Sequence, residues 1–215
     1  MLEIKQFAFG PFGVNTYIIY DTETSDAIVV DPGMNTGNEN QRFDKFIADK
    51  KLTVTQIVNT HLHIDHCLGD NYVKDKYGAL ISAHIDDAFL GDNMQAQAEM
   101  FGLRPFDSRK VTIDIHLKGG DIITLGKHRI TVLHVPGHSP GGIALYCADS
   151  NFVIAGDSLF RGSIGRTDLP GGNYTTLVKA VKEKLMTLPG TTLVLPGHDM
   201  STNISFEKAN NSFLK

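Results

Sequence analysis

Four apolar runs in this chain end directly in side chains that can bind a metal ion, and this repetition limits the possible folds more than any other feature. The runs are followed by Thr60-His61-Leu62-His63-Ile64-Asp65-His66, by Pro136-Gly137-His138, by Gly156-Asp157 and by Pro196-Gly197-His198. Short apolar runs bounded by Gly and Pro are typical of buried strands. We therefore expect four strand ends to point to one rim of a sheet-rich fold.

Apolar runs of strand length recur along the whole chain, at residues 14–20, 27–30, 54–58, 79–82, 130–135, 143–147, 152–155 and 192–195. Runs that follow one another without a helix, at the N-terminus and within 122–155, predict antiparallel pairing. Helices between other runs must cover sheet faces. The pattern thus favours an α/β protein (α+β in some schemes), with two sheets between helical layers.

Three helices are predicted from periodicity and capping. Phe43, Phe46 and Ile47 share one face of the first, and residues 70–77 form a second. In the third, Leu177, Val181 and Leu185 share a face, and Asn173 is placed to cap its N-terminus. Residues 90–110 are rich in Met, Gln and Gly, and we interpret them as a helix and loop near the site.

Composition excludes several classes of partner and location. The chain has 20 basic and 24 acidic residues, so it lacks the positive field that would hold nucleic acid or an anionic membrane. Cys67 and Cys147 form no spaced pair, which suits a reducing cytoplasm. The N-terminus has no export signal, and no apolar run spans a bilayer. We expect one cytoplasmic domain over residues 1–215, with a small-molecule substrate.

The strand-end residues are the ligand types that first-row divalent metals accept. The seven candidates exceed the needs of one tetrahedral ion, so two ions sharing one carboxylate are expected: His61, His63, Asp65, His66, His138, Asp157 and His198. Zinc is favoured, and iron or manganese is also accepted by such a set. Three histidines and an aspartate within six positions would cost several kcal/mol if buried unpaired. His84, His116, His128 and His134 are interpreted as ordinary surface or packed residues.

The motif H-x-H-x-D-H, followed after strands by P-G-H, G-D and P-G-H, resembles the metallo-β-lactamase superfamily. The segments G-D-S-L-F-R-G-S-I-G-R-T-D-L-P-G-G at 156–172 and P-G-H-D-M-S-T-N-I-S-F-E-K-A-N-N-S-F-L at 196–214 resemble its short bacterial glyoxalase II-like (hydroxyacylglutathione hydrolase-like) branch. The resemblance implies a four-layer αββα sandwich. It also implies one metal on His61, His63 and His138, a second on Asp65, His66 and His198, and Asp157 bridging them.

The same resemblance implies a binuclear metal-dependent hydrolase, in which a bridging hydroxide attacks a thioester or ester carbonyl and Asp65 orients it. Full-length glyoxalase II continues into a helical region that contacts glutathione, whereas this chain ends at Lys215. We therefore expect no separate C-terminal substrate domain, and glutathione recognition stays open, as does the oligomeric state.

Three further residues have two possible roles each. Arg166 lies where that branch places a basic substrate contact, or it pairs with Asp168. Asp31 either accepts a hydrogen bond from a ligating histidine or only ends a strand before Pro-Gly. Cys67 is interpreted as a packing residue rather than a ligand.

Three alternative functions remain. Persulfide dioxygenases share the fold and the G-R-T-D stretch, here 165–168, but use one iron held by two histidines and an aspartate; the following L-P-G-G favours the hydrolase branch. A lactonase or other ester hydrolase fits the same chemistry. A non-catalytic binding module would be expected to have lost ligands, and all seven positions are filled.

Overall fold

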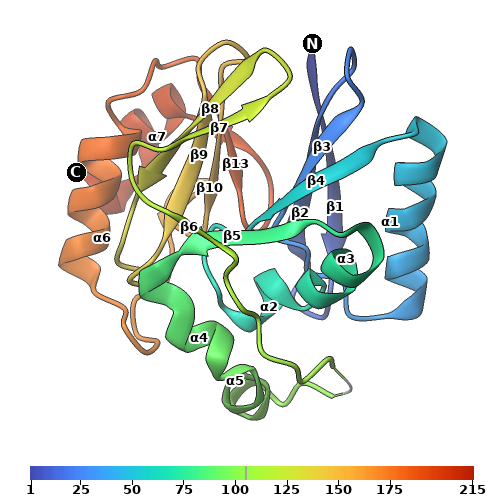
Figure 1. The fold of residues 1–215 in the computed structure, drawn as a ribbon. Helices are drawn as coiled ribbons and strands as arrows, with labels where there is room; N and C mark the ends of the chain where they lie inside the picture. Colours follow the sequence, from blue (N-terminus) through green and yellow to red (C-terminus); the bar gives the residue numbers. More distant parts are fainter. Residues whose placement is uncertain (105) are drawn as a thin grey trace. The chain divides into compact units, whose positions relative to one another are not determined.

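The computed structural model describes residues 1–104 and 106–215, which form two compact units. Unit 1 comprises residues 1–116 and 125–127, and unit 2 comprises residues 117–124 and 128–215. Two six-stranded sheets run through the chain in the orders β1-β2-β3-β4-β5-β6 and β14-β13-β10-β9-β8-β7 (Figure 1). The expectation of a single domain over the whole chain stays a prediction.

The first sheet is antiparallel at its beginning and parallel further on. Its strands are β1 (Leu2–Phe9), β2 (Val14–Asp21), β3 (Asp26–Val30), β4 (Thr53–Val58), β5 (Leu80–His84) and β6 (Ile115–Leu117). β1, β2 and β3 pair antiparallel, as predicted, and β3, β4 and β5 pair parallel. Parallel neighbours need crossovers, which α1 and α3 supply. β4 therefore ends, at Val58, beside parallel neighbours and just before the predicted ligand loop.

Among its described residues, unit 1 also contains five α-helices and one 3₁₀ turn. They are α1 (Gly37–Lys50), α2 (Ile64–Cys67), α3 (Asp70–Tyr77), the 3₁₀ turn Ile85–Asp87, α4 (Ala88–Asp92) and α5 (Met94–Phe101). Thr36 and Glu39 form a capping box at the start of α1. Phe43 and Ile47 are buried in the same core cluster as Val73 of α3 and the sheet residue Ile57, so α1 and α3 pack on the first sheet (Figure 1).

The second sheet combines antiparallel strands with one parallel pair. Its strands are β7 (Ile122–Leu125), β8 (His128–His134), β9 (Ile143–Cys147), β10 (Phe152–Gly156), β13 (Leu193–Pro196) and β14 (Thr202–Asn203). β8, β9 and β10 pair antiparallel, β10 and β13 pair parallel, and β13 and β14 pair antiparallel. A separate hairpin joins β11 (Leu159–Phe160) to β12 (Ser163–Ile164). The parallel pair makes β10 and β13 end at the same sheet edge.

The helices of unit 2 pack on this sheet. α6 (Tyr174–Ala180) continues into a π-helical turn at Val181–Leu185, and α7 (Ile204–Asn210) precedes a 3₁₀ turn at Ser212–Leu214. Asn173 caps α6, as predicted, by accepting a hydrogen bond from the Thr176 amide. Leu177, Val181 and Leu185 are fully buried in one cluster with residues of β9, β10 and β13. α6 therefore packs on these strands (Figure 1).

Some elements of the structure, β1 and α7 among them, differ from the sequence prediction. β1 and α7 were not predicted as elements: β1 buries mainly its end residues, which weakens its alternation, and α7 has only seven residues. Residues 90–110 contain most of α4, all of α5 and a following loop, which confirms a helix and loop there; residue 105 of that segment lies outside the described residues.

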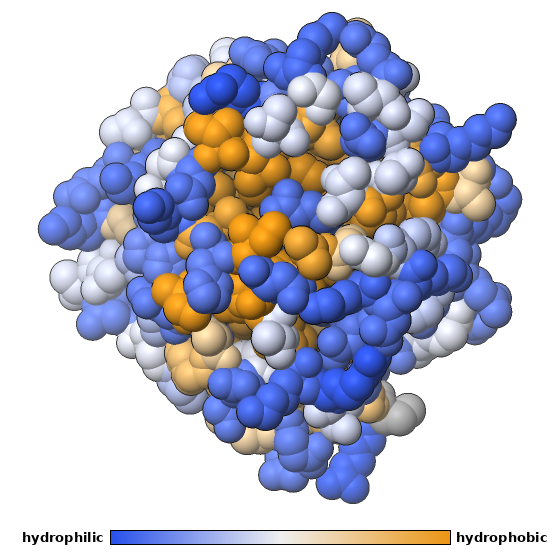
Figure 2. Space-filling model, in the orientation of Figure 1, coloured by the Kyte–Doolittle hydropathy of each residue, from blue (hydrophilic) through white to orange (hydrophobic). Residues whose placement is uncertain are grey.

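The visible surface mixes hydrophobic and hydrophilic residues (Figure 2). Large apolar side chains that are exposed include Ile85, Phe89 and Met100. Apolar atoms make up much of any folded protein's surface, so their presence does not define an interface. Across residues 1–104 and 106–215, every helix is too short or too polar to cross a membrane.

Candidate functional site

The loop after β4 gathers four of the predicted ligands within unit 1. His61, His63 and His66 are buried, and the Asp65 side chain is 17% exposed. The ring centroid of His61 lies 4.7 Å from that of His63 and 4.0 Å from that of His66. Asp65 Oδ2 lies 3.7 Å from His66 Nε2. Unit 1 thus brings together all four donors that the H-x-H-x-D-H motif predicted.

Asp31 fixes the orientation of one of these histidines. Its Oδ2 accepts hydrogen bonds from His66 Nδ1, at 3.0 Å, and from Thr60 Oγ1, at 2.6 Å. Its Oδ1 accepts from the Thr60 amide at 2.7 Å, and the side chain is fully buried. A histidine that donates one ring nitrogen to a carboxylate presents the other to a metal. The hydrogen bond expected of Asp31 is therefore present, and it directs His66 Nε2 toward the ligand cluster.

Two further buried side chains, not singled out by the sequence, hold the same loop. Asp87 Oδ2 accepts from the Leu62 amide at 3.2 Å. Gln97 of α5 accepts from the Ile64 amide at 3.0 Å and donates to the Leu62 carbonyl at 3.1 Å. Gln97 belongs to the segment expected near the site, and its side-chain amide connects that segment to the ligand loop.

Unit 2 brings together the other three predicted ligands. Asp157 Oδ2 lies 3.6 Å from both His138 Nε2 and His198 Nε2. Asp157 follows β10 and His198 follows β13, and the Gly197 amide donates to the Gly156 carbonyl at 2.8 Å. The parallel pairing of these strands therefore places a carboxylate and an imidazole side by side at one sheet edge.

The backbone of Arg166 orients His138. His138 Nδ1 lies 2.7 Å from the Arg166 carbonyl oxygen, so this nitrogen donates and Nε2 faces Asp157. Gly165 makes the approach possible, because a Cβ there would lie 1.8 Å from the Asp157 carbonyl oxygen and 3.1 Å from His138 Nδ1. The sequence drew attention to the Arg166 side chain, whereas its main chain makes the contact with a predicted ligand.

Glycine is required next to two of these ligands. Gly137 has a φ of 131°, and a Cβ there would lie 2.3 Å from the Leu177 amide nitrogen. Gly156 has a φ of 50°. Both conformations favour glycine. Near His198 the left-handed residue is Asp199, with a φ of 61°, rather than Gly197.

The Arg166 side chain forms the ion pair that was one of its two expected roles. Nε and one terminal nitrogen lie 2.7 Å from the two carboxylate oxygens of Asp168. Both side chains are more than half exposed, so the pair contributes little to stability. A contact between Arg166 and substrate stays a prediction.

The ion pair makes a pH-dependent prediction. Hydrogen bonds from Arg166 lower the pKa of Asp168 to about 2 in the folded protein. In the unfolded chain the pKa of this aspartate has its ordinary value of about 3.9. The stabilising interaction is therefore complete above about pH 3.9 and is lost as the pH falls through about 2. We expect Arg166→Gln to raise the Asp168 pKa toward about 3.9, measured by carboxyl NMR titration. Arg161→Gln serves as the control, and an unchanged Asp168 pKa in Arg166→Gln would contradict the pairing.

Cys67 has the environment of a packing residue. Its sulfur lies 3.3 Å from the His63 carbonyl oxygen and 3.7 Å from Met94 Sδ. Burial, with nearby carboxylates, raises the pKa of the Cys67 thiol well above its ordinary value. The thiol form is therefore favoured, in keeping with its exclusion from the ligand set.

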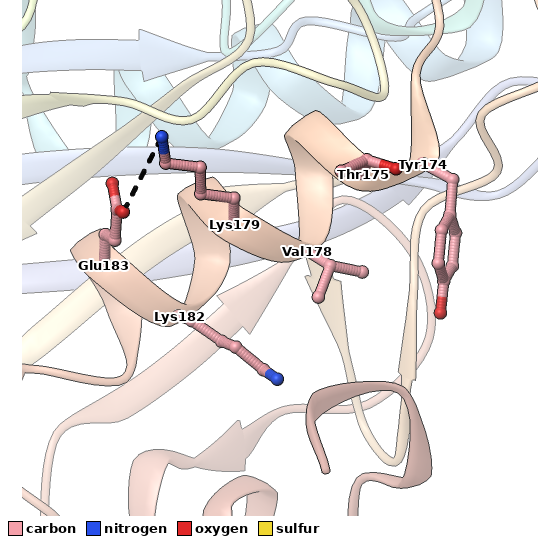
Figure 3. Close-up of a pocket in the computed structure, with 6 residues that line it drawn as sticks. All are labelled: Tyr174, Thr175, Val178, Lys179, Lys182 and Glu183. Atoms are coloured by element: carbon pink, nitrogen blue, oxygen red, sulfur yellow. Dashed lines mark ion pairs between the residues drawn. The ribbon is translucent and has the colours of Figure 1, made fainter.

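A cavity of 390 Å³ lies along α6 and the following π-helical turn (Figure 3). It is lined by Tyr174, Thr175, Val178, Lys179, Lys182 and Glu183. Lys179 Nζ lies 4.0 Å from a Glu183 carboxylate oxygen. None of the predicted ligands lines this cavity, so it is distinct from the candidate site.

The donor sets of both units fit a divalent metal. Each consists of imidazoles with carboxylate, and each contains a histidine whose Nδ1 is held by a protein oxygen: His66 by Asp31, and His138 by Arg166. Candidate metal-binding residues are thus present in unit 1 and in unit 2.

Comparisons with known proteins agree with this reading of the residues. A family model described as the metallo-beta-lactamase superfamily matches residues 9–198. The chain is 35% identical to the probable metallo-hydrolase YqgX of Bacillus subtilis, with 98% of this chain and 96% of that protein covered. It is 33% identical to the hydroxyacylglutathione hydrolase GloC of Haemophilus influenzae, with 94% and 93% covered. These relatives support a metal-binding hydrolase.

Solved structures match over nearly the whole chain. BLEG-1 B3 metallo-beta-lactamase gives a TM-score of 0.89 at 30% identity, covering 99% of this chain and 100% of that one. TTHA1623 in a di-iron-bound form gives 0.87 at 30% identity, covering 98% and 100%. ETHE1 from Myxococcus xanthus gives 0.80 at 27% identity, covering 98% and 83%. The expected fold class is confirmed, and the chain belongs to the metallo-beta-lactamase superfamily.

Proposed function

We propose that the chain is a binuclear metal-dependent thioester hydrolase acting on a small molecule. The observation that carries the proposal is the matched orientation of His66 and His138, each with Nδ1 held by a protein oxygen so that Nε2 can bind a metal. The 33% identity with a relative named hydroxyacylglutathione hydrolase, over 94% of this chain, supports a thioester substrate.

In this proposal the ligands of the two units act together. One metal would be held by His61, His63 and His138, and the other by Asp65, His66 and His198. Asp157 would bridge the two, and its carboxylate already lies equally close to two histidine nitrogens in unit 2. Zinc is the favoured metal, although the di-iron-bound form of TTHA1623 shows that a structural relative takes iron.

The bound metals would supply an activated water, with its pKa lowered toward about 7. Asp65 is the least buried of the predicted unit 1 ligands, and its carboxylate would accept a hydrogen bond from that water and hold it toward the substrate carbonyl. The Arg166 guanidinium, half-exposed on the Asp157 side of the site, would exchange Asp168 for a substrate carboxylate. We propose a cytoplasmic location, with both cysteines as buried free thiols.

The test is a paired measurement on one sample. The protein is purified without added metal, metals per chain are counted by elemental analysis, and S-lactoylglutathione hydrolysis is assayed. We expect about two metals per chain together with turnover. His116→Ala, which changes an exposed histidine outside the ligand set, serves as the control and should match the wild type.

Two outcomes would contradict the proposal in different ways. A single iron per chain, with oxygen uptake on glutathione persulfide and no thioester hydrolysis, would establish a dioxygenase instead. If the protein holds two metals and hydrolyses a lactone but not S-lactoylglutathione, the proposed metal centre stands and the proposed substrate class changes from thioesters to esters.

A further inference from the structure

The buried carboxylate of Glu207, on α7, collects hydrogen bonds from three separate segments of unit 2. The Gly162 amide nitrogen lies 3.2 Å from its Oε1 and 3.0 Å from its Oε2. Thr202 Oγ1 donates to Oε1 at 2.6 Å, and Asn211 Nδ2 donates to Oε2 at 2.8 Å. The bonds from Thr202 and Asn211 are buried away from water, and those from the Gly162 amide are partly buried. Such a fully bonded carboxylate fixes the segments that surround it.

One of these segments is the β11–β12 hairpin, whose two ends reach predicted metal ligands. The hairpin begins two residues after Asp157 and ends just before Gly165 and Arg166. The Arg166 carbonyl accepts the hydrogen bond from His138 Nδ1. A shift of the hairpin therefore moves the backbone that carries Asp157 and the backbone that orients His138.

Further contacts reach the same hairpin, from Asn211 just after α7 and from Phe206 within it. Asn211 Nδ2 also donates to the Ser163 carbonyl at 3.0 Å, and Arg161 at the hairpin turn lies 4.2 Å from the Phe206 ring centroid. Thr202 belongs to β14, on the segment that follows His198. Glu207 thus connects to the segments that follow Asp157 and His198 and, through the hairpin, to the Arg166 carbonyl that orients His138.

We propose that Glu207 is a positioning residue for His138, Asp157 and His198, acting through the β11–β12 hairpin and through Thr202. The expected effect of Glu207 on turnover rests on the proposed function. The expected effect of Glu207 on metal binding does not. Both carboxylate oxygens accept hydrogen bonds, so alanine removes one acceptor from each of three donors: the partly buried Gly162 amide and the buried side chains of Thr202 and Asn211. Glutamine keeps the shape and one acceptor oxygen, so it should restore part of what alanine loses.

The experiment compares Glu207→Ala, Glu207→Gln and Asn203→Ala. Asn203 caps the same helix, because its Oδ1 accepts a hydrogen bond from the Phe206 amide at 2.8 Å. Asn203→Ala removes this hydrogen bond within α7 and leaves the contacts of Glu207 with the hairpin in place. Zinc affinity is measured on the full chain by competition with a chromophoric chelator, and the denaturation midpoint is recorded for each variant. We expect Glu207→Ala to weaken zinc binding by about 2- to 30-fold, Glu207→Gln by less, and Asn203→Ala to lower only the midpoint.

The same variants are assayed on S-lactoylglutathione, where kcat should fall in parallel with zinc affinity. Wild-type zinc affinity in Glu207→Ala, with a midpoint lowered as in Asn203→Ala, would overturn the proposal. If Glu207→Ala does not fold, wild-type zinc affinity in Glu207→Gln would overturn it and a weakened affinity would support it. If the wild type binds zinc but leaves S-lactoylglutathione intact, the proposed function fails while the zinc measurements still decide the role of Glu207.

Discussion

Replacing Asp157 by alanine is expected to lower S-lactoylglutathione turnover by about 1000-fold or more and to reduce bound metal. Asp157 Oδ2 lies 3.6 Å from the Nε2 atoms of both His138 and His198, so this carboxylate lies close to both of the other predicted ligands of unit 2. The contribution of correctly held metals to such a reaction is several kcal/mol, and about 4 kcal/mol corresponds to about 1000-fold in rate. Elemental analysis and kcat/KM measured on one preparation check this.

The matched control is Asp149→Ala, which removes an exposed aspartate from a turn of the same unit. It should retain the metal content and turnover of the wild type. If Asp157→Ala also retained both, the bridging role of Asp157 and the proposed mechanism would have to be abandoned.

Replacing Asp31 by asparagine should weaken zinc binding by about 10- to 100-fold, the usual effect of removing a hydrogen-bond partner of a ligating histidine. Asn tolerates the left-handed backbone that Asp31 adopts, with a φ of 50°, so the change tests the carboxylate rather than the turn. The new amide would face donors from Thr60 and His66, which leaves a buried polar group unpaired and costs about 1–3 kcal/mol of stability.

Two measurements separate these effects: zinc competition with a chelator, and urea denaturation of the metal-free protein. Asp49→Asn, an exposed change on α1, should leave both unchanged. A variant Asp31→Asn that loses stability but binds zinc as the wild type does would mean that His66 keeps its orientation without the carboxylate.

Much of the scaffold was predictable because its signals are local. Asn173 at the start of α6 and the buried face of Leu177, Val181 and Leu185 follow from spacing and capping within one helix. The predicted strand ends were informative for the same reason, since each ligand is adjacent in sequence to the strand that positions it. A residue's place on its own element needs no knowledge of distant contacts.

The supports of the candidate site were not predictable, because their roles depend on distant partners. Gln97 and Asp87 hold the ligand loop of unit 1 from α5 and from the 3₁₀ turn, and Glu207 holds the hairpin from α7. In the sequence each is an ordinary polar residue without a distinctive neighbour. The role of the Arg166 carbonyl was equally hidden, since a main-chain contact leaves no trace in residue identity.

The parallel pairing of β10 with β13 has a consequence for how the protein acquires metal. Ile154 pairs with Leu195, which lies far along the chain, so Asp157 and His198 meet only after a long loop has closed and α6 has been placed. Such non-local contacts are slow to form. The four donors of the 61–66 loop, in contrast, are neighbours in sequence. A chain that has not finished folding would therefore offer a metal ion an incomplete set of donors. Tight metal binding would then come after folding and would not direct it.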